Sequence, residues 1–151
     1  MSERTKLVSI DNSNKSLVEE FCANAKSSLK TFRYFDHRSL DAINSHLVTY
    51  VLTLSASPIA YGHLDAEKDK VWLGVCVAEG RTGQGYGKRI MEALIGYAGE
   101  NHIAAIDLSV DKVNEAAIAM YNQMGFSCVD TNDKSYFMRL NLANIIGDKN
   151  E

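Results

Sequence analysis

Three strand-like runs lie close together in the middle of the sequence, and the short turns between them restrict the fold. Each run is rich in residues that favour β-strands, and they span residues 47–54, 59–64 and 71–77. The connections at 55–58 and 65–69 are too short for a crossover helix, so the runs predict antiparallel hairpins. The only proline, Pro58, is expected in the first turn and outside the strands.

Helical and strand patterns on both sides of these runs complete the expected element order. An edge strand is expected at 6–10, a helix at 15–29 and a short helix from Ser39 to about His46. After the three strands come a helix with an apolar stripe, a strand at 103–110, a helix from Asn114 to Gly125 and a hairpin of 126–129 with 136–140. This order predicts a mixed α+β sheet with helices packed on it.

Length and composition indicate one soluble domain. The 151 residues are 46% hydrophobic and 23% charged, and we expect a single domain over 1–151 with a core at about 5–141 and a tail at 142–151. The net charge of −3 gives no reason to expect nucleic acid or an anionic membrane as a partner. No signal peptide or apolar span is visible, and the scattered cysteines, odd in number, favour a cytoplasmic protein.

The cysteines and histidines are dispersed along the chain. Cys22, Cys76 and Cys128 are expected to be reduced core residues. Neither residue type shows metal-ligand spacing, so we expect no metal site.

A glycine-rich stretch joins the third strand to the helix that follows it. Gly83, Gly85 and Gly87 alternate and precede Lys88. Glycine lets a ligand approach the backbone closely, and a helix N-terminus offers unpaired N–H groups and a positive dipole end. The stretch therefore predicts a phosphate site, with a flexible turn that binds nothing as the alternative.

Two other phosphate motifs do not fit this stretch. A Walker A loop needs glycine five positions before its Gly-Lys pair and a hydroxyl residue after it, but Thr82 and Arg89 stand there. A dinucleotide-binding fingerprint needs a glycine where Lys88 stands.

A second group of residues lies on the later helix. Asn114, Ala117 and Tyr121 are spaced to share one face. The phenol of Tyr121 can donate a proton to a leaving thiolate. The alternative is that Asn114 is only an N-cap and Tyr121 only a core residue, which would explain the same spacing. If the strands at 71–77 and 103–110 are neighbours, their C-terminal ends place both groups around one cleft.

With these two motifs the sequence resembles the GNAT acetyltransferase superfamily, over residues 47–140 and more loosely before them. The resemblance is carried by residues 75–77 and 81–87, and by Val110, Asn114, Ala117, Tyr121, Gly125 and Phe126. It implies a GNAT-like α+β fold, with a mixed, mostly antiparallel central sheet of about seven strands flanked by about four helices. It also implies acetyl-CoA, or a related acyl-CoA, as donor, usually an amine as acceptor, and a homodimer as one arrangement.

The resemblance assigns roles to particular residues. The strand backbone at Val75, Cys76 and Val77 would pair with the pantetheine arm, and Asn114 would contact that arm or orient the site. Tyr121 would bind the coenzyme and act as the general acid for its thiolate. The pyrophosphate would be held by the turn, through Thr82, Gly83, Gln84, Gly85, Tyr86, Gly87 and Lys88.

Two positions depart from the family pattern. The family usually has Arg or Gln where Thr82 stands, so the turn must rely on backbone N–H groups more than on a side chain there. Members that acetylate N-termini of ribosomal proteins often carry a glutamate where Ser109 stands, which argues against such a substrate.

The acceptor side is less constrained by the sequence. The stretch from Phe32 to Arg38 lies where the family builds its acceptor pocket, and it is faintly similar to acetyltransferases of amino-sugar nucleotides; an aromatic helix end without a substrate role is the alternative. The candidate substrate-binding residues are Arg33, Tyr34, Phe35 and His63. A general base or a water relay must deprotonate the amine, and the candidates are His63, Asp65, Glu79 and Asp107.

Three functions remain open at this point. The first is an N-acetyltransferase for a small primary amine, such as an amino-sugar nucleotide. The second is a peptide or protein N-acetyltransferase. The third is a non-catalytic domain that binds acyl-CoA and regulates a partner.

Overall fold

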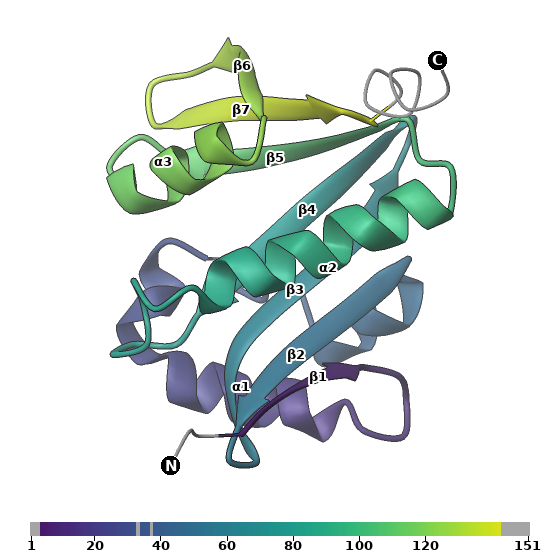
Figure 1. Ribbon diagram of the computed structural model, residues 1–151, viewed down its shortest axis with the longest axis vertical. Coiled ribbons are helices and arrows are strands. Elements are labelled where there is room, and N and C mark those ends of the chain that lie inside the picture. Colours follow the sequence, from purple (N-terminus) through teal and green to yellow (C-terminus); the bar gives the residue numbers. More distant parts are fainter. Residues whose placement is uncertain (1–3, 33, 37, 143–151) are drawn as a thin grey trace. The chain divides into compact units, whose positions relative to one another are not determined.

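The computed structural model describes residues 4–32, 34–36 and 38–142 of the chain. Their strands form a seven-stranded sheet in the order β1-β2-β3-β4-β5-β7-β6 (Figure 1). The strands are β1 (Thr5–Ser9), β2 (Val48–Leu54), β3 (Ser57–Glu67), β4 (Lys70–Val77), β5 (Ala105–Asp111), β6 (Ser127–Thr131) and β7 (Ser135–Asn141). The helices are α1 (Ser16–Ala25), α2 (Tyr86–Glu100) and α3 (Glu115–Gln123), with 3₁₀ helices η1 (Lys26–Lys30) and η2 (Leu40–Ser45). The predicted α+β class, mostly antiparallel, is confirmed.

The hairpin of β2 and β3 corrects one prediction about Pro58. The turn consists of Ser55 and Ala56, both with positive φ, and Pro58 lies inside β3 rather than in the turn. Proline cannot donate a ladder hydrogen bond, but the register of the pair shifts between Leu52 and Thr53, opposite this position. The bulge therefore lets a proline stand in the strand.

Two other element boundaries and the burial of one cysteine differ from those predicted. β3 continues to Glu67, so the turn before β4 is the tight one at Lys68, where φ is 59°. The helix expected at 15–29 is α-helical only to Ala25, because Lys26 takes a φ of 51° and a 3₁₀ turn follows. Cys128 is exposed and is no core residue, while Cys76 is buried and Cys22 half-buried.

The contacts divide the chain into two compact units. The first unit comprises residues 1–65 and 74–94, and the second comprises residues 66–73 and 95–151. β3, β4 and α2 each contribute residues to both units. No described helix is long and apolar enough to cross a membrane.

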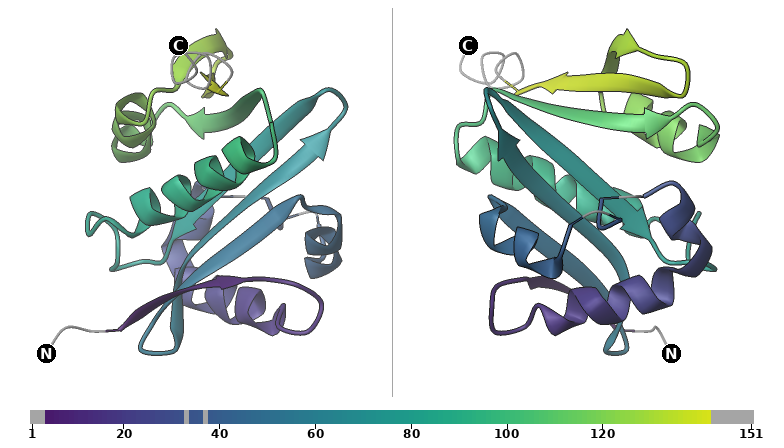
Figure 2. Two further views of the ribbon diagram at one scale, coloured as in Figure 1. Left: turned by 45° about the vertical axis from the view of Figure 1, so that its right-hand side comes forward. Right: turned by 180° about the vertical axis from the view of Figure 1, so that it is seen from behind.

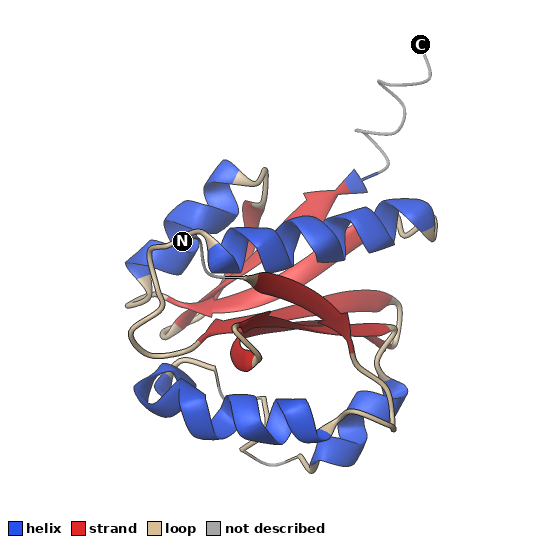
Figure 3. Ribbon diagram, turned by 60° about the horizontal axis from the view of Figure 1, so that its bottom comes forward, coloured by secondary structure: helices blue, strands red, loops and turns tan. Residues whose placement is uncertain are grey.

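In the first unit, helices cover both faces of β2 and β3. Tyr61 and Gly62 are successive residues of β3 and therefore face opposite sides. On one side lies α1 (Figure 2), and the ring of Tyr61 stacks on its Phe21 with centroids 5.8 Å apart. On the other side lies α2 (Figure 3), where Ile90 and Leu94 face Gly62.

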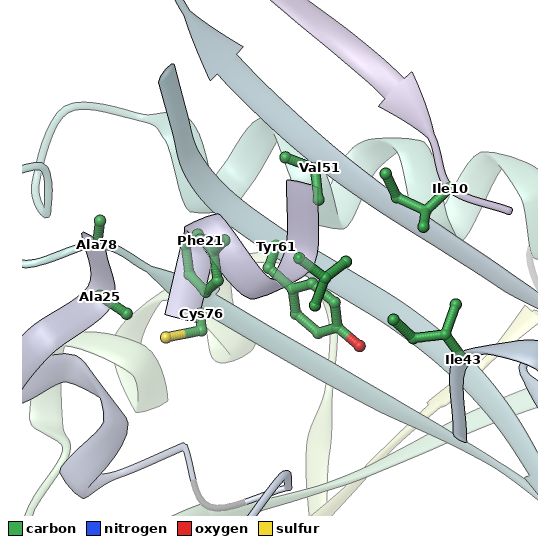
Figure 4. Packing of buried hydrophobic residues seen from close by; sticks show 9 residues of the cluster. Ile10, Phe21, Ala25, Ile43, Val51, Tyr61, Cys76 and Ala78 are labelled. Atoms are coloured by element: carbon green, nitrogen blue, oxygen red, sulfur yellow. The ribbon is translucent and has the colours of Figure 1, made fainter. Parts of the chain in front are cut away.

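The side of β3 that faces α1 holds an apolar core. Its buried members come from α1, β2, β3 and β4 and from the segments that join them (Figure 4). They are Ile10, Val18, Phe21, Ala25, Ile43, Val51, Tyr61, Cys76 and Ala78. This core fixes the strands that carry the candidate site.

Gly62→Ala is expected to destabilise the protein by about 1–3 kcal/mol, because α2 packs directly on this glycine. An added Cβ would lie 2.3 Å from Cγ2 of Ile90 and 3.0 Å from Cδ1 of Leu94. Denaturant unfolding measures the loss. Gly96→Ala is the matched control, since nothing lies within 4 Å of its Cβ position in α2. It should instead stabilise by about 0.5–1 kcal/mol, and equal losses for the two variants would contradict the packing.

The second unit is built around β5. β5 pairs in parallel with β4 at Trp72 and Asp107, and antiparallel with β7 along its whole length. The prediction that the strands at 71–77 and 103–110 are neighbours is thus confirmed by the pairing of β4 with β5. α3 begins at its N-cap Asn114, and Gly125 follows it with a φ of 100°, as the sequence predicts.

Candidate active site

The glycine-rich turn before α2 presents a run of unpaired backbone donors. Gly83 and Gly85 have φ of 75° and 88°, and nothing lies within 4 Å of the Cβ position of either. Among the described residues, backbone hydrogen bonds run from the N–H of Arg81 to Ala78 and from the N–H of Arg89 to Gly85. The N–H groups from residue 82 to residue 88 donate to no described backbone oxygen. Such a row at a helix N-terminus is suited to an anion.

The side chains around this turn support the same chemistry. Thr82, Gln84 and Lys88 are exposed, and Gln84 reaches back to the carbonyl of Gly80 at 3.4 Å. No acidic residue stands between Arg81 and Arg89, and the guanidinium of Arg89 donates to the hydroxyl of Thr5. The positive charge adds to that of the helix dipole.

The end of β4 offers a backbone edge rather than a nucleophile. Val75 and Val77 are half-buried, whereas Cys76 is 6% exposed within the core. Burial raises the pKa of the Cys76 thiol to about 12. A thiol with so high a pKa is not the attacking group of a covalent mechanism, because the thiolate is the nucleophile.

An aromatic–histidine cluster lies beside this strand in the first unit; it comprises Phe32, Tyr34, Phe35, His46, Tyr61 and His63. The ring of His63 lies 4.2 Å from that of His46 and 4.3 Å from that of Tyr34, measured between centroids. Phe32 and Phe35 pack on Tyr61 at 5.5 and 5.7 Å. His63 and Tyr61 are almost fully buried. Of the predicted acceptor residues, Tyr34, Phe35 and His63 thus come together, and Arg33 lies outside the described residues.

Hydrogen bonds connect the polar members of the cluster to its rim. The hydroxyl of Tyr34 lies 3.1 Å from Oδ2 of Asp65 and 2.7 Å from Nε2 of His46. Nδ1 of His46 is bonded to Oγ1 of Thr49 at 2.9 Å. The guanidinium of Arg38 lies over the Tyr34 ring, 4.2 Å from its centroid, and donates to the Tyr34 carbonyl. Arg38 is therefore already engaged with Tyr34.

Burial favours the neutral form of both histidines of the cluster. Desolvation lowers the pKa of His63 well below its usual value, and the nearby His46 and Arg38 lower it further. Desolvation also lowers the pKa of His46, while Asp65 opposes the shift. Neutral imidazoles can donate one hydrogen bond and accept another.

Of the four candidate general bases, two are engaged in contacts away from the aromatic–histidine cluster and two lie in or beside it. Asp107 is buried in the second unit in a bidentate ion pair with Arg139, both bonds measuring 2.9 Å, and Lys70 lies 3.8 Å away. Glu79 is bonded to Ser27, which lowers its pKa. His63 and Asp65 both belong to or border the aromatic–histidine cluster.

Asn114 and Tyr121 lie on α3 in the second unit. Asn114 is half-buried, and its side-chain oxygen accepts the N–H of Ala117 at 3.3 Å, so it is the N-cap. Tyr121 is 6% exposed and packs against Phe126, with ring centroids 5.9 Å apart. The N-cap and core roles are therefore real, and further roles remain proposals.

Sequence reasoning missed His46, Tyr61 and Gly74 as parts of this arrangement. Tyr61 and His63 are two residues apart on one strand and so share a face, which is a signal the sequence carries. Glycine inside a strand often marks a close approach, as Gly74 does here. No sequence pattern points to His46, which reaches the cluster from the segment after η2. The described residues include no group of His, Cys, Asp or Glu suited to a metal ion.

Comparison with known proteins places the chain in a family. The model of the acetyltransferase (GNAT) family matches residues 14–126. No curated protein matches the sequence.

Many solved structures share the fold. The ribosomal-protein-S18-alanine N-acetyltransferase from Escherichia coli superposes with a TM-score of 0.70 at 22% identity, covering 91% of this chain and 94% of that one. yncA from Salmonella typhimurium, solved with its cofactor acetyl-CoA, superposes with a TM-score of 0.73 at 17% identity, covering 92% of this chain and 94% of that one. The PaiA N-acetyltransferase from Thermoplasma acidophilum, in complex with coenzyme A, gives 0.72 at 14% identity, covering 93% and 99%. Because the family model covers most of the sequence, the chain belongs to the GNAT family and is an acetyl-CoA-dependent N-acetyltransferase.

Proposed function

We propose that the acetyl acceptor is a primary amine of a small molecule and that it binds at the aromatic–histidine cluster. One observation carries this proposal: the His63 ring lies directly over Gly74. Gly74 immediately precedes Val75, the first of the three β4 residues proposed to pair with the pantetheine arm. Half-buried Asp65 borders the cluster and offers a carboxylate to an ammonium group. Enclosed aromatic surroundings with a few polar groups are typical of small-molecule sites.

We propose that the glycine turn binds the pyrophosphate of the donor. The unpaired N–H groups and the open space at Gly83 and Gly85 support this role, since a phosphate oxygen needs donors that it can approach closely. The residues proposed to bind the coenzyme are Val75, Cys76, Val77, Thr82, Gly83, Gln84, Gly85, Tyr86, Gly87, Lys88, Asn114 and Tyr121.

The chemistry assigns the proton-transfer roles. The neutral amine nitrogen bonds to the acetyl carbon, the carbon–sulfur bond breaks, and the amine proton leaves to a base or to water. We propose that Tyr121 gives its phenol proton to the departing thiolate, which yields coenzyme A and the amide. The acetyl thioester is supplied by acetyl-CoA, and a backbone N–H of residues 75–77 would stabilise the carbonyl oxygen as charge develops.

A protein N-terminus is the second candidate acceptor. The fold is similar to that of an enzyme that acetylates the alanine of ribosomal protein S18, which favours it. Ser109, where such enzymes often carry glutamate, opposes it. The family match covers parts of both units, which supports one acetyltransferase domain over 1–151 with either acceptor.

A thiol-release assay with acetyl-CoA tests the acceptor class. The panel comprises amino-sugar nucleotides, amino sugars, polyamines, amino acids and peptides with a free N-terminus. We expect the highest kcat/KM with a small amine, and first with the amino sugars. A peptide preference would overturn the proposal in favour of the second candidate. An acetyl-CoA-induced rise in Tm, measured in parallel, shows that the tested protein binds its donor.

A further inference from the structure

The hydroxyl of Tyr61 and the imidazole of His63 form a buried pair. The hydroxyl oxygen lies 2.7 Å from Nδ1 of His63, and Tyr61 is 0% exposed. Within the described part of the chain, this is the one hydrogen bond of the Tyr61 hydroxyl. Burial raises the pKa of Tyr61 well above its usual value, so the phenol keeps its proton.

This pair fixes the tautomer of His63. If Nδ1 carried the imidazole proton, it would donate to Tyr61 and leave the phenol proton buried without an acceptor, at a cost of about 1–3 kcal/mol. If the phenol donates to Nδ1, both groups are satisfied. The second arrangement is favoured, and it puts the imidazole proton of neutral His63 on Nε2.

The groups around His63 hold it in the neutral form. Tyr34 donates its one hydroxyl proton to the carboxylate of Asp65, so Nε2 of His46 must donate to Tyr34. The His46 ring lies 4.2 Å from that of His63 between centroids, tilted by 34°, and burial lowers the pKa of His46. Among the described residues, the other titratable or charged groups near the cluster are Arg38, which lies over Tyr34, and the thiols of Cys22 and Cys76, which influence Tyr61. Of these groups, only Asp65 favours a charged imidazole, and burial outweighs it at His46.

Nε2 of His63 lies above β4. It stands 2.8 Å from the point that a Cβ of Gly74 would occupy, so only glycine leaves room for the ring. His63 is 2% exposed, and its one hydrogen bond with a described residue is at Nδ1, so Nε2 has no acceptor among these residues. Its N–H is therefore left for a molecule bound beside Gly74.

We propose that His63 is a neutral hydrogen-bond donor that selects acetyl acceptors with an oxygen atom close to the amino group. The proposal rests on the proposed function, because it places the acceptor beside Gly74. The matching chemistry is a hydroxyl or carbonyl oxygen near a primary amine, as in an amino sugar, an amino acid or the N-terminus of a peptide. His63 then binds the acceptor, and the amine proton leaves by another route.

The tautomer is tested directly by NMR of the protein labelled with ¹⁵N at histidine, at neutral pH and without substrate. We expect the His63 signals of a ring protonated at Nε2 and bare at Nδ1. Tyr61→Phe should let both tautomers appear, because the donor to Nδ1 is gone. A wild-type ring protonated at Nδ1, or at both nitrogens, would overturn the proposal whatever the enzyme acetylates.

Selectivity is tested with matched amines, of which one member of each pair lacks the oxygen. The pairs are glucosamine with cyclohexylamine, and alanine amide with isopropylamine, which separates a sugar from a peptide source. His63→Leu should lower kcat/KM for the oxygen-bearing amine about 10-fold to 100-fold and change that for its partner less than about 3-fold. Each variant is compared with wild type on one amine, so differences in amine basicity cancel.

His63→Gln distinguishes a donor from a base, because its amide can donate a hydrogen bond but cannot take up a proton. It should restore much of the selectivity that the leucine variant loses. His102→Gln, at an exposed position, is the matched control and should behave as wild type. Equal losses on both members of a pair, with no recovery by glutamine, would assign His63 as a general base and overturn the proposal. If no amine of either pair reacts while acetyl-CoA still raises Tm, the small-amine proposal fails, and the NMR result alone decides the donor role.

Discussion

Tyr121→Phe is expected to lower kcat by about 10²-fold to 10⁴-fold while changing the affinity for acetyl-CoA by less than about 3-fold. The substitution removes one hydroxyl and keeps the ring that packs against Phe126. A free thiol has a pKa of about 8.5, and a general acid that protonates the departing thiolate contributes a rate factor of this size. Single-turnover release of coenzyme A measures the step, and calorimetric titration measures the binding.

Tyr136→Phe is the matched control for this experiment. Tyr136 belongs to the same unit, is half-buried on β7, and its ring contact with Lys112 needs no hydroxyl. Its kcat should equal that of wild type. If Tyr121→Phe turned over normally, Tyr121 would be a core residue and the proton would come from elsewhere. If instead coenzyme affinity and stability fell together with kcat, the hydroxyl would have a structural role.

The sequence predicted the fold well where local chemistry decides it. Short turns force antiparallel hairpins, Asn114 and Gly125 begin and end a helix, and the glycine stretch precedes another. Each of these features depends on a few neighbouring residues, so spacing and residue type suffice. The glycine turn was also predicted as a phosphate site, and the unpaired N–H groups there agree with that prediction without testing it.

The errors share a physical cause, which is that long-range contacts decided the outcome. Pro58 stands in β3 because a bulge in the pairing with β2 tolerates it, and no local signal reports the register of two strands. His46 joins His63 because the chain folds back after η2. The tautomer of His63 depends on its hydrogen bond to Tyr61 and on the burial of Tyr61. Burial results from the packing of the whole unit, so local sequence does not report it.

Gly85→Val is expected to weaken acetyl-CoA binding at least about 100-fold and to abolish the coenzyme-induced rise in Tm. Gly85 has a φ of 88°, and its Cβ position is open to solvent rather than blocked by protein. A valine side chain would therefore project into the space proposed for the pyrophosphate. Loss of two charge-assisted hydrogen bonds from the backbone, at roughly 1.5–3 kcal/mol each, corresponds to a change of this size.

Gly80→Val separates loss of the phosphate site from backbone strain. Gly80 has a φ of 83° and an equally open Cβ position, but it precedes the row of unpaired N–H groups. Both variants carry a β-branched residue in a left-handed conformation and should lose similar stability, about 1–3 kcal/mol. Only Gly85→Val should lose the coenzyme. Equal affinity in the two variants would mean that residues 83–88 do not hold the phosphates, and that the unpaired donors of this turn serve the helix alone.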